Sequence, residues 1–414
     1  MYQYQTPERI EAMVKELLHR VTWRHLAYVG IVVLSVLLLA VGNRIASRDM
    51  YRFQEVDPAE VATARVDRIL TRDVQRYQMG DDVLEDVTVY FEATITGGPR
   101  KGAELAAVQL IRAFDPVPMR EVSEGERIAI IHSQDQGTSQ YRWEMQEYLR
   151  TTPLILLVAL FLGLVMLFGK GKGVSTVLSL CFTCAAVFAV LIPAILSGRN
   201  IYLATLAVCA YVVIMTLALV NGLNRKSFAA AMGCMGGLLA AGGLTLIMDS
   251  MLRLTGYLDE NSAFLLNLGI FTTADLRALI FAGILIGAMG AALDVAVSMA
   301  ASLAELKATA PELGFAALVR SGFNIGRDIL GTMTNTLILA YIGSCLPLLL
   351  LLLVHMNSVT ELLNREMMVV EILQAVVGSI GMLCVIPLTA VIAGYIYTVK
   401  GKEKAPAKPD AGTL

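Results

Sequence analysis

A carboxylate inside a long apolar segment is the residue of this sequence most able to do chemistry. Asp294 lies in the apolar stretch 278–303, roughly 15 Å from the end of that stretch at a helical rise of ~1.5 Å per residue. Small and polar residues recur around it at steps of three and four, so a helix would gather them on one face. They are Gly287, Gly290, Ser298, Ser302 and Glu305. Such a carboxylate is costly in an apolar surrounding unless it meets a partner or a polar pathway.

A second polar stripe begins the apolar stretch 329–354. Its residues are Asp328, Gly331, Thr332, Asn335 and Gly343, with Thr334 and Thr336 nearby. The two stretches run in opposite directions. Asn335 lies ~10 Å beyond Asp328 at the helical rise, so Asn335 and Asp294 reach similar depths.

The two stripes together predict a cation or proton site. Carboxylate, amide and hydroxyl oxygens suit a hard cation or a proton relay. The predicted ligands are Asp294, Ser298, Thr332, Asn335 and Thr336, and the predicted interface charges are Glu305, Arg327 and Asp328. In the structural alternative, glycines allow close packing, hydroxyl and amide groups bond across helices, and Asp294 is protonated or paired with Arg327.

Membrane helices are the elements that would position these residues. Apolar residues make up 56% of the chain, and charged residues only 16%, against about 25% in soluble proteins. Stretches near the ~20 residues that a membrane helix needs lie at 26–42, 153–169, 175–196, 201–221, 228–248, 278–303, 329–354 and 370–397. We therefore predict a polytopic α-helical membrane protein with about eight transmembrane helices.

Two local patterns refine these helices. Five glycines between Gly233 and Gly243 favour close helix packing over local breaks in the fifth stretch. Thr272 and Asp275 predict the amino-terminal cap of the sixth.

Residues 43–150 predict a small β-rich domain, a barrel or an OB-like fold. Runs at 61–70, 83–96, 103–114 and 125–133 alternate partly between apolar and polar residues, which favours four or five short strands. The turn signals Met79-Gly80-Asp81-Asp82, Gly97-Gly98-Pro99 and Asp115-Pro116 separate them. This domain carries no metal-ligand cluster, nucleophile elbow or phosphate loop.

The flanking charges predict the orientation. With the amino terminus inside, fifteen Lys and Arg residues fall in inside segments and four in short outside loops. Both termini are then cytoplasmic. The protein itself is expected in the cell membrane. The predicted parts are a cytoplasmic amphipathic segment 1–25, a retained helix 26–42, an extracytoplasmic β-rich domain 43–150, a seven-helix domain 151–397 and a flexible cytoplasmic tail 398–414.

Several function classes are disfavoured by the sequence. A net charge of −2 without a basic patch argues against a nucleic-acid partner. Cys181 and Cys184 form a CxxC inside an apolar stretch, where packing is the simpler role. The four histidines are scattered and none has metal-ligand spacing, so we expect neither an enzyme nor a cofactor.

Three blocks of the sequence resemble the YibE/F family of bacterial membrane proteins. They are "GAMGAALDVAVSMAASLAELK" at 287–307, "SGFNIGRDILGTMTNTLILAYIG" at 321–343 and "GSIGMLCVIPLTAVIAGY" at 378–395, and the resemblance extends from about residue 60 to 397. It implies a multi-pass membrane protein and no particular activity. The order of features around Asp294 is also similar to that of SecD-type export factors, in which a helix aspartate couples to proton flow.

Two functions are therefore open. The first is transport of a small solute or ion, with Asp294 as the cation or proton site. The alternative is a non-transporting assembly or export-accessory protein whose outer β-rich domain binds a partner. Apart from the lipid bilayer, the expected partners are a small ion or proton and, from the glycine-rich faces, another copy of the chain.

Overall fold

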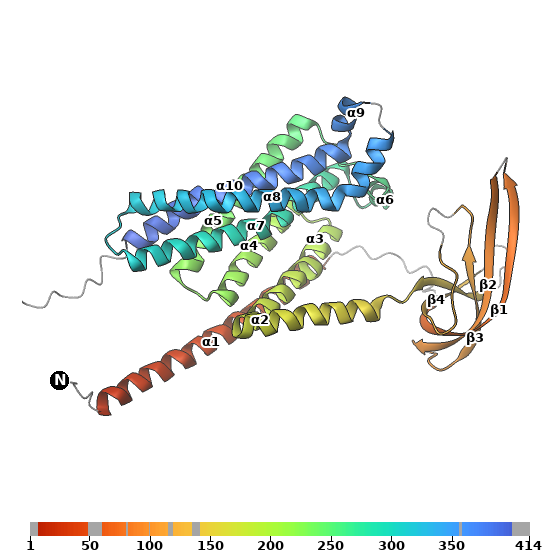
Figure 1. Cartoon of the computed structure of the whole chain (residues 1–414), viewed down its shortest axis with the longest axis horizontal. Coiled ribbons are helices and arrows are strands. Elements are labelled where there is room, and N and C mark those ends of the chain that lie inside the picture. The colour runs from red at the N-terminus through yellow and green to blue at the C-terminus, as the bar shows by residue number, and fades with distance from the viewer. Residues whose placement is uncertain are drawn as a thin grey trace, which may run out of the picture. The chain divides into compact units, whose positions relative to one another are not determined.

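The computed structural model describes residues 7–48, 60–79, 82–98, 100–114, 119–134, 141–355 and 358–399 (Figure 1). Its contacts divide the chain into two units, one of residues 52–164 and one of residues 1–51 with 165–414. Of the predicted tail 398–414, residues 398 and 399 belong to the last helix, and residues 400–414 lie outside the described residues. The centre of the Gly80-Asp81 turn and the Asp115-Pro116 turn also lie outside them.

The first unit contains the predicted β-rich domain. Its strands are β1 (Glu60–Met79), β2 (Asp82–Gly97), β3 (Glu104–Ile111), β4 (Arg127–Gln134) and β5 (Tyr141–Tyr148). They close into a barrel in the order β1-β2-β3-β5-β4, with β3 and β5 parallel. Apolar side chains fill the interior, among them Phe91, Ile95, Ile128 and Ile130. The fully buried Gln109 bonds the backbone at Arg120 and Val122, each at 2.8 Å.

Two features of this unit differ from the sequence expectation. β5 was not among the predicted runs, because its inward apolar residues are few: Trp143 and Met145 are buried in the core, Tyr148 packs on it partly buried, and the positions between them are charged or polar. β1 is also much longer than the run predicted at its start. The second half of β1 is mostly polar. It pairs with β2, so the backbone hydrogen bonds between the two strands continue beyond the buried core.

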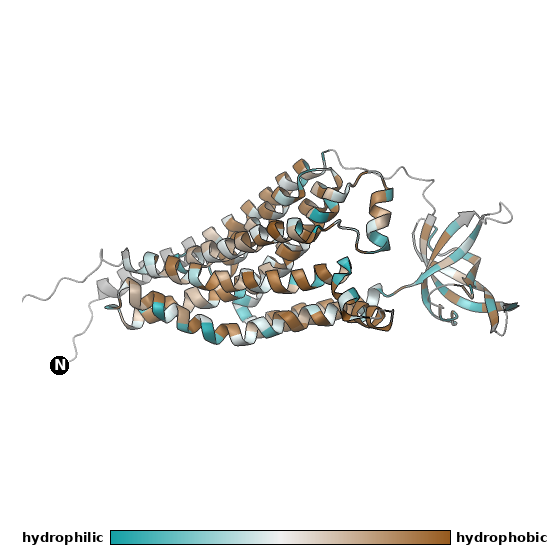
Figure 2. Ribbon diagram, turned by 90° about the horizontal axis from the view of Figure 1, so that it is seen from above, coloured by the Kyte–Doolittle hydropathy of each residue, from teal (hydrophilic) through white to brown (hydrophobic). Residues whose placement is uncertain are grey.

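The second unit is helical. Its elements are α1 (Pro7–Ala46), most of α2 (Thr151–Ala186), the π-helix η1 (Val187–Leu191), α3 (Ile192–Leu196), α4 (Ile201–Val220), α5 (Arg225–Leu252), α6 (Glu260–Asn267), α7 (Thr273–Thr309), α8 (Phe315–His355), α9 (Val359–Asn364) and α10 (Glu366–Val399). Among the described residues, seven helical segments are long and apolar enough to cross a membrane. Figure 2 shows that apolar residues predominate along the helices, with hydrophilic ones interspersed.

The apolar segment 151–196 is one of those seven, although the sequence predicted two crossings there. Its 46 residues would extend roughly 70 Å as one straight helix, more than twice the ~30 Å hydrocarbon core of a bilayer. The helix is interrupted at Lys170, whose φ of 49° and ψ of −130° are not helical. Gly173 then packs directly on the carbonyl oxygen of Val165, so the chain bends back sharply at this point.

Close packing of α5 on α10 organises the helical core. A methyl group on Gly236 would lie 2.6 Å from Leu388 Cδ1, and one on Gly381 would lie 2.7 Å from the Ala241 methyl. Gly237 is more restricted, since its Cβ would overlap Val385. α5 is also continuous through all its glycines. The sequence interpretation of close packing is therefore confirmed.

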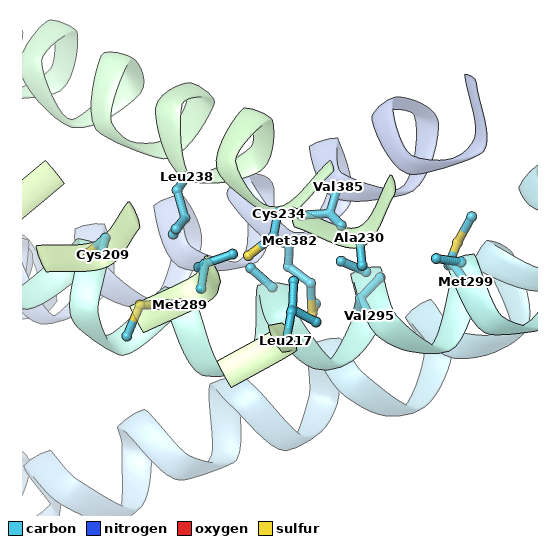
Figure 3. Packing of buried hydrophobic residues seen from close by; sticks show 14 of the residues in the cluster. Cys209, Leu217, Ala230, Cys234, Leu238, Met289, Val295, Met299, Met382 and Val385 are labelled. Carbon is cyan, nitrogen blue, oxygen red and sulfur yellow. The ribbon is translucent and has the colours of Figure 1, made fainter. Parts of the chain in front are cut away.

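The buried cluster continues from this seam onto α4 and α7 (Figure 3). Cys209 and Leu217 of α4, Cys234 of α5, and Met289 and Met299 of α7 meet in it. All six cysteines are free; Cys209 and Cys234 are buried in this cluster, whereas Cys181 and Cys184 are exposed, so the packing role of that pair stays a prediction. The predicted cap of α7 is confirmed as well, because Thr272 and Asp275 form a reciprocal capping box.

Candidate functional site

Asp294 lies midway along α7, on its uncovered side. The exposed residues on this side are Gly287, Gly290, Asp294, Ser298, Ser302 and Glu305, and we call them the Asp294 face. They recur every three or four residues, as the sequence predicted, so the helix places them in one stripe. All six residues are exposed in the structure of the single chain.

The opposite side of α7 explains this orientation. Ala292, Val295, Ala296, Met299 and Leu303 are each at most 1% exposed, and they pack in the core of α4, α5 and α10 (Figure 3). Because apolar side chains of α7 occupy the whole interior side, the polar residues must point outward. The position of Asp294 therefore follows from amphipathic patterning of a helix that is apolar on average.

The predicted residues of α8 show the same arrangement. Asp328, Gly331, Thr332, Asn335 and Thr336 are exposed, and we call them the Asn335 face. Gly322 and Gly326 lie on the covered side of the helix, where they pack against Ala390 and Ile386 of α10. Arg327 is exposed too, and with Arg320 it lines a shallow cavity of about 620 Å³ at the start of α8.

α7 and α8 are in contact, but their predicted ligands do not bond to one another. The Thr332 hydroxyl donates to the Ile329 carbonyl at 3.1 Å, and the Thr336 hydroxyl donates to the Thr332 carbonyl at 2.8 Å. Both bonds stay within α8. Within the described part of the chain, Asp294 has neither a hydrogen bond nor an ion pair with Arg327.

This arrangement differs from both simple expectations for Asp294. A formed ligand cluster would place its carboxylate against Asn335, and a structural pair would place it against Arg327. Instead, the carboxylate is exposed on a mostly apolar helix. It can accept a proton, a cation or a donor from another molecule without first breaking a bond in this chain.

Sequence reasoning missed a second polar group farther along the same helices. A Cβ on Gly287 would lie 2.9 Å from the Tyr341 hydroxyl of α8 and 3.4 Å from Gln374 Nε2 of α10. The Tyr341 hydroxyl is buried and lacks a hydrogen-bond partner among the described residues. Glu371 precedes Gln374 by three residues on α10. Glu371 lies inside the apolar stretch 370–397, and a charged residue in such a stretch was the sequence signal that could have identified this second polar group.

One ion pair and a set of hydrogen bonds to a carboxylate tie together the start of α7, the end of α5 and the start of α10. Arg277 Nη1 of α7 lies 3.4 Å from Asp249 Oδ2 of α5. The Glu366 carboxylate at the start of α10 accepts hydrogen bonds of 2.7 Å from the Thr255 and Gly256 amides. These contacts hold the loop after α5 against the beginning of α10, so this end of the bundle is tied together by polar bonds.

A cavity lies beside the carboxyl-terminal part of α7, and neither Asp294 nor Ser298 lines it. It has a volume of about 610 Å³ and is lined on α7 by Val297, Ala301 and Ala304. Val297 lies one residue before Ser298 and one turn from Asp294. In the described residues no cluster of three or more His, Cys, Asp or Glu side chains could hold a metal ion. The Asp294 face thus carries two carboxylates, Asp294 and Glu305, which lie roughly 16 Å apart along the helix at ~1.5 Å per residue.

Comparison with known proteins places the helical unit in a family. The family model described as YibE/F-like protein matches residues 157–399, more than half of the chain. This match runs from α2 to the end of α10 and includes both polar faces. A search of curated proteins and a search of solved structures each gave no match.

Proposed function

The chain belongs to the YibE/F-like family, and on this premise we propose that it is a multi-pass protein of the bacterial cell membrane that transports a small ion or solute. Asp294 is its cation or proton site. The observation that carries the proposal is the exposed carboxylate of Asp294, without a partner in the described chain, midway along an apolar helix. Because an isolated charge in lipid is strongly unfavourable, this position implies water, a cation or a proton at the site.

The membrane placement has separate support. Seven apolar segments among the described residues are long enough to span a bilayer. In this proposal the longest of them crosses twice, and the break at Lys170, flanked by Lys172, supports this because the helix is interrupted there. Eight crossings put both termini on the same side, and the excess of Lys and Arg in the flanks makes that side the cytoplasm. The barrel between the first two crossings is then extracytoplasmic.

The Asp294 face and the Asn335 face define the route in this proposal. The Ser298 hydroxyl, one turn from the carboxylate on α7, solvates a cation or passes on a proton, and the Thr332 hydroxyl and Asn335 amide line the α8 side of the route. A second copy of the chain shields these exposed faces from lipid, because small residues such as Gly290 and Gly331 permit close helix approach. Transport then requires Asp294 to exchange its proton or cation with both sides of the membrane.

The experiment is a flux measurement on the full chain in sealed liposomes. We expect the protein to dissipate an imposed proton or monovalent-cation gradient faster than liposomes with the same lipid and no protein. A pH-sensitive dye inside the vesicles reports proton flux, and a cation-sensitive dye reports the alternative. Protein that inserts and remains folded but dissipates neither gradient would exclude ion passage.

A feature of the barrel favours a second function, the docking of a partner. Residues 75–79 of β1 and 82–86 of β2 pair only with each other, and we call them the β1–β2 ribbon. The Arg76–Glu85 pair at 2.8 Å crosses the ribbon. The Arg72–Glu121 pair at 2.8 Å holds its base, and the hydrogen bond from Arg72 keeps the pKa of Glu121 below its usual value. A two-stranded ribbon has weak stability of its own and open backbone edges that can pair with another chain.

Shortening the ribbon separates the two functions. Replacing residues 76–85 by an Asn-Gly turn should leave the barrel closed, since β1 and β2 keep their pairing with β4 and β3. If the ribbon serves docking, in-cell crosslinks from this domain to other proteins disappear while liposome flux is unchanged. Unchanged crosslinks would remove the ribbon from any docking role.

A further inference from the structure

A basic cavity lies at the start of α5, in the helical unit. It has a volume of about 610 Å³, and its lining includes Lys172, Arg225 and Lys226. Its lining residues include no carboxylate. Within the described part of the chain none of the three cations forms an ion pair. Three uncompensated positive charges around one cavity favour an anionic occupant.

The backbone adds to this preference. The Asn224 side chain caps α5 by accepting from the Ser227 amide at 2.9 Å. Arg225 and Lys226 are then the first two residues of the helix, where amide groups have no acceptor within the helix and the helix dipole is positive. The same short segment therefore offers two cationic side chains and two available N–H groups.

An apolar groove adjoins the basic cavity and identifies the kind of anion. The groove has a volume of about 950 Å³ and shares Asn224, Arg225 and Ser227 with the cavity. The rest of its lining is nearly all apolar, with exposed side chains such as Leu223, Phe228 and Met232. A soluble anion would leave this groove empty. A molecule with an anionic head and a hydrocarbon chain would fill both parts.

We propose that the cavity and groove together bind one anionic phospholipid. Its phosphate lies among Lys172, Arg225 and Lys226, and an acyl chain follows the groove between α4 and α5. Basic pockets between membrane helices are suited to such head groups. A zwitterionic lipid is disfavoured because its choline would bring a fourth positive charge. This inference rests on the membrane placement proposed above but not on transport.

The test is lipid binding to the full chain in detergent, measured by native mass spectrometry. Phosphatidylglycerol and phosphatidylcholine with identical acyl chains are the probes. We expect wild-type protein to retain phosphatidylglycerol in preference. The combined change Lys172→Gln, Arg225→Gln and Lys226→Gln should weaken that binding by about tenfold or more. Arg253→Gln, an exposed cation at the other end of α5, is the matched control and should bind like wild type.

A groove variant tests the acyl chain independently. Ala231 lines the groove, and Ala231→Phe should weaken phosphatidylglycerol binding while the three cations remain. Equal retention of both lipids by wild type, or unchanged binding in the triple variant, would overturn the proposal. Displacement of phosphatidylglycerol by millimolar inorganic phosphate, with no effect of Ala231→Phe, would also overturn it in favour of a soluble-anion site. No gradient is involved, so failure here is distinct from absence of flux.

Discussion

Asp294→Asn is expected to reduce ion flux in liposomes by roughly tenfold or more, to near the level of protein-free vesicles. The side chain keeps its shape and its place on the exposed side of α7, so packing is preserved. An amide cannot take up and release a proton near neutral pH, and it carries no negative charge for a cation. The measurement compares initial rates at equal amounts of inserted protein.

Two further variants make this result specific. Asp294→Glu keeps the carboxylate one methylene farther from the helix and should retain a substantial part of the flux. Glu312→Gln removes an exposed carboxylate from the turn between α7 and α8 and should leave the flux unchanged. Wild-type flux in Asp294→Asn would remove Asp294 from the mechanism. It would favour the accessory function, in which the helices serve as an anchor.

Gly237→Val is expected to prevent correct packing of α5 on α10. A Cβ at this position would overlap Val385 and would lie 2.8 Å from the carbonyl oxygen of Gly381. A side chain can change rotamer, but the backbone of α10 cannot retreat without separating the two helices. We expect a loss of about 3 kcal/mol or more, seen as a much lower melting temperature or as aggregation in detergent.

Gly243→Ala is the matched control on the same helix. A Cβ there meets no atom within 4 Å, so the substitution should be neutral or should stabilise by up to ~1 kcal/mol through helix propensity. The comparison uses thermal unfolding followed by circular dichroism. If both variants melt like wild type, the α5–α10 seam is not packed as described. If both lose stability equally, glycine flexibility matters more than close approach.

Much of the helical unit could be predicted because its signals are local. The three- and four-residue spacing around Asp294 predicted which residues share its helix face. The glycines of α5 predicted close packing, and Thr272 with Asp275 predicted the cap of α7. Each depends on neighbours within one or two helical turns, which the sequence contains directly.

The parts that could not be predicted depend on distant contacts. β5 has few inward apolar residues, and its place in the barrel depends on pairing with β4 and β3. The second polar group escaped notice because it combines Gly287, Tyr341 and Gln374 from three different helices. For Asp294, the residue spacing identified the residues that share its helix face. It did not identify what covers that face, because the face is exposed in the single chain.

The most direct test of the proposed function is therefore whether water or lipid surrounds position 294. In a chain with its six cysteines replaced, Asp294→Cys should react with a charged, membrane-impermeant thiol reagent in liposomes. Leu239→Cys is the comparison, because this exposed apolar residue of α5 should react only with a lipid-soluble reagent. We expect the two positions to differ in this way. Reaction of position 294 with the lipid-soluble reagent alone would contradict the proposed function.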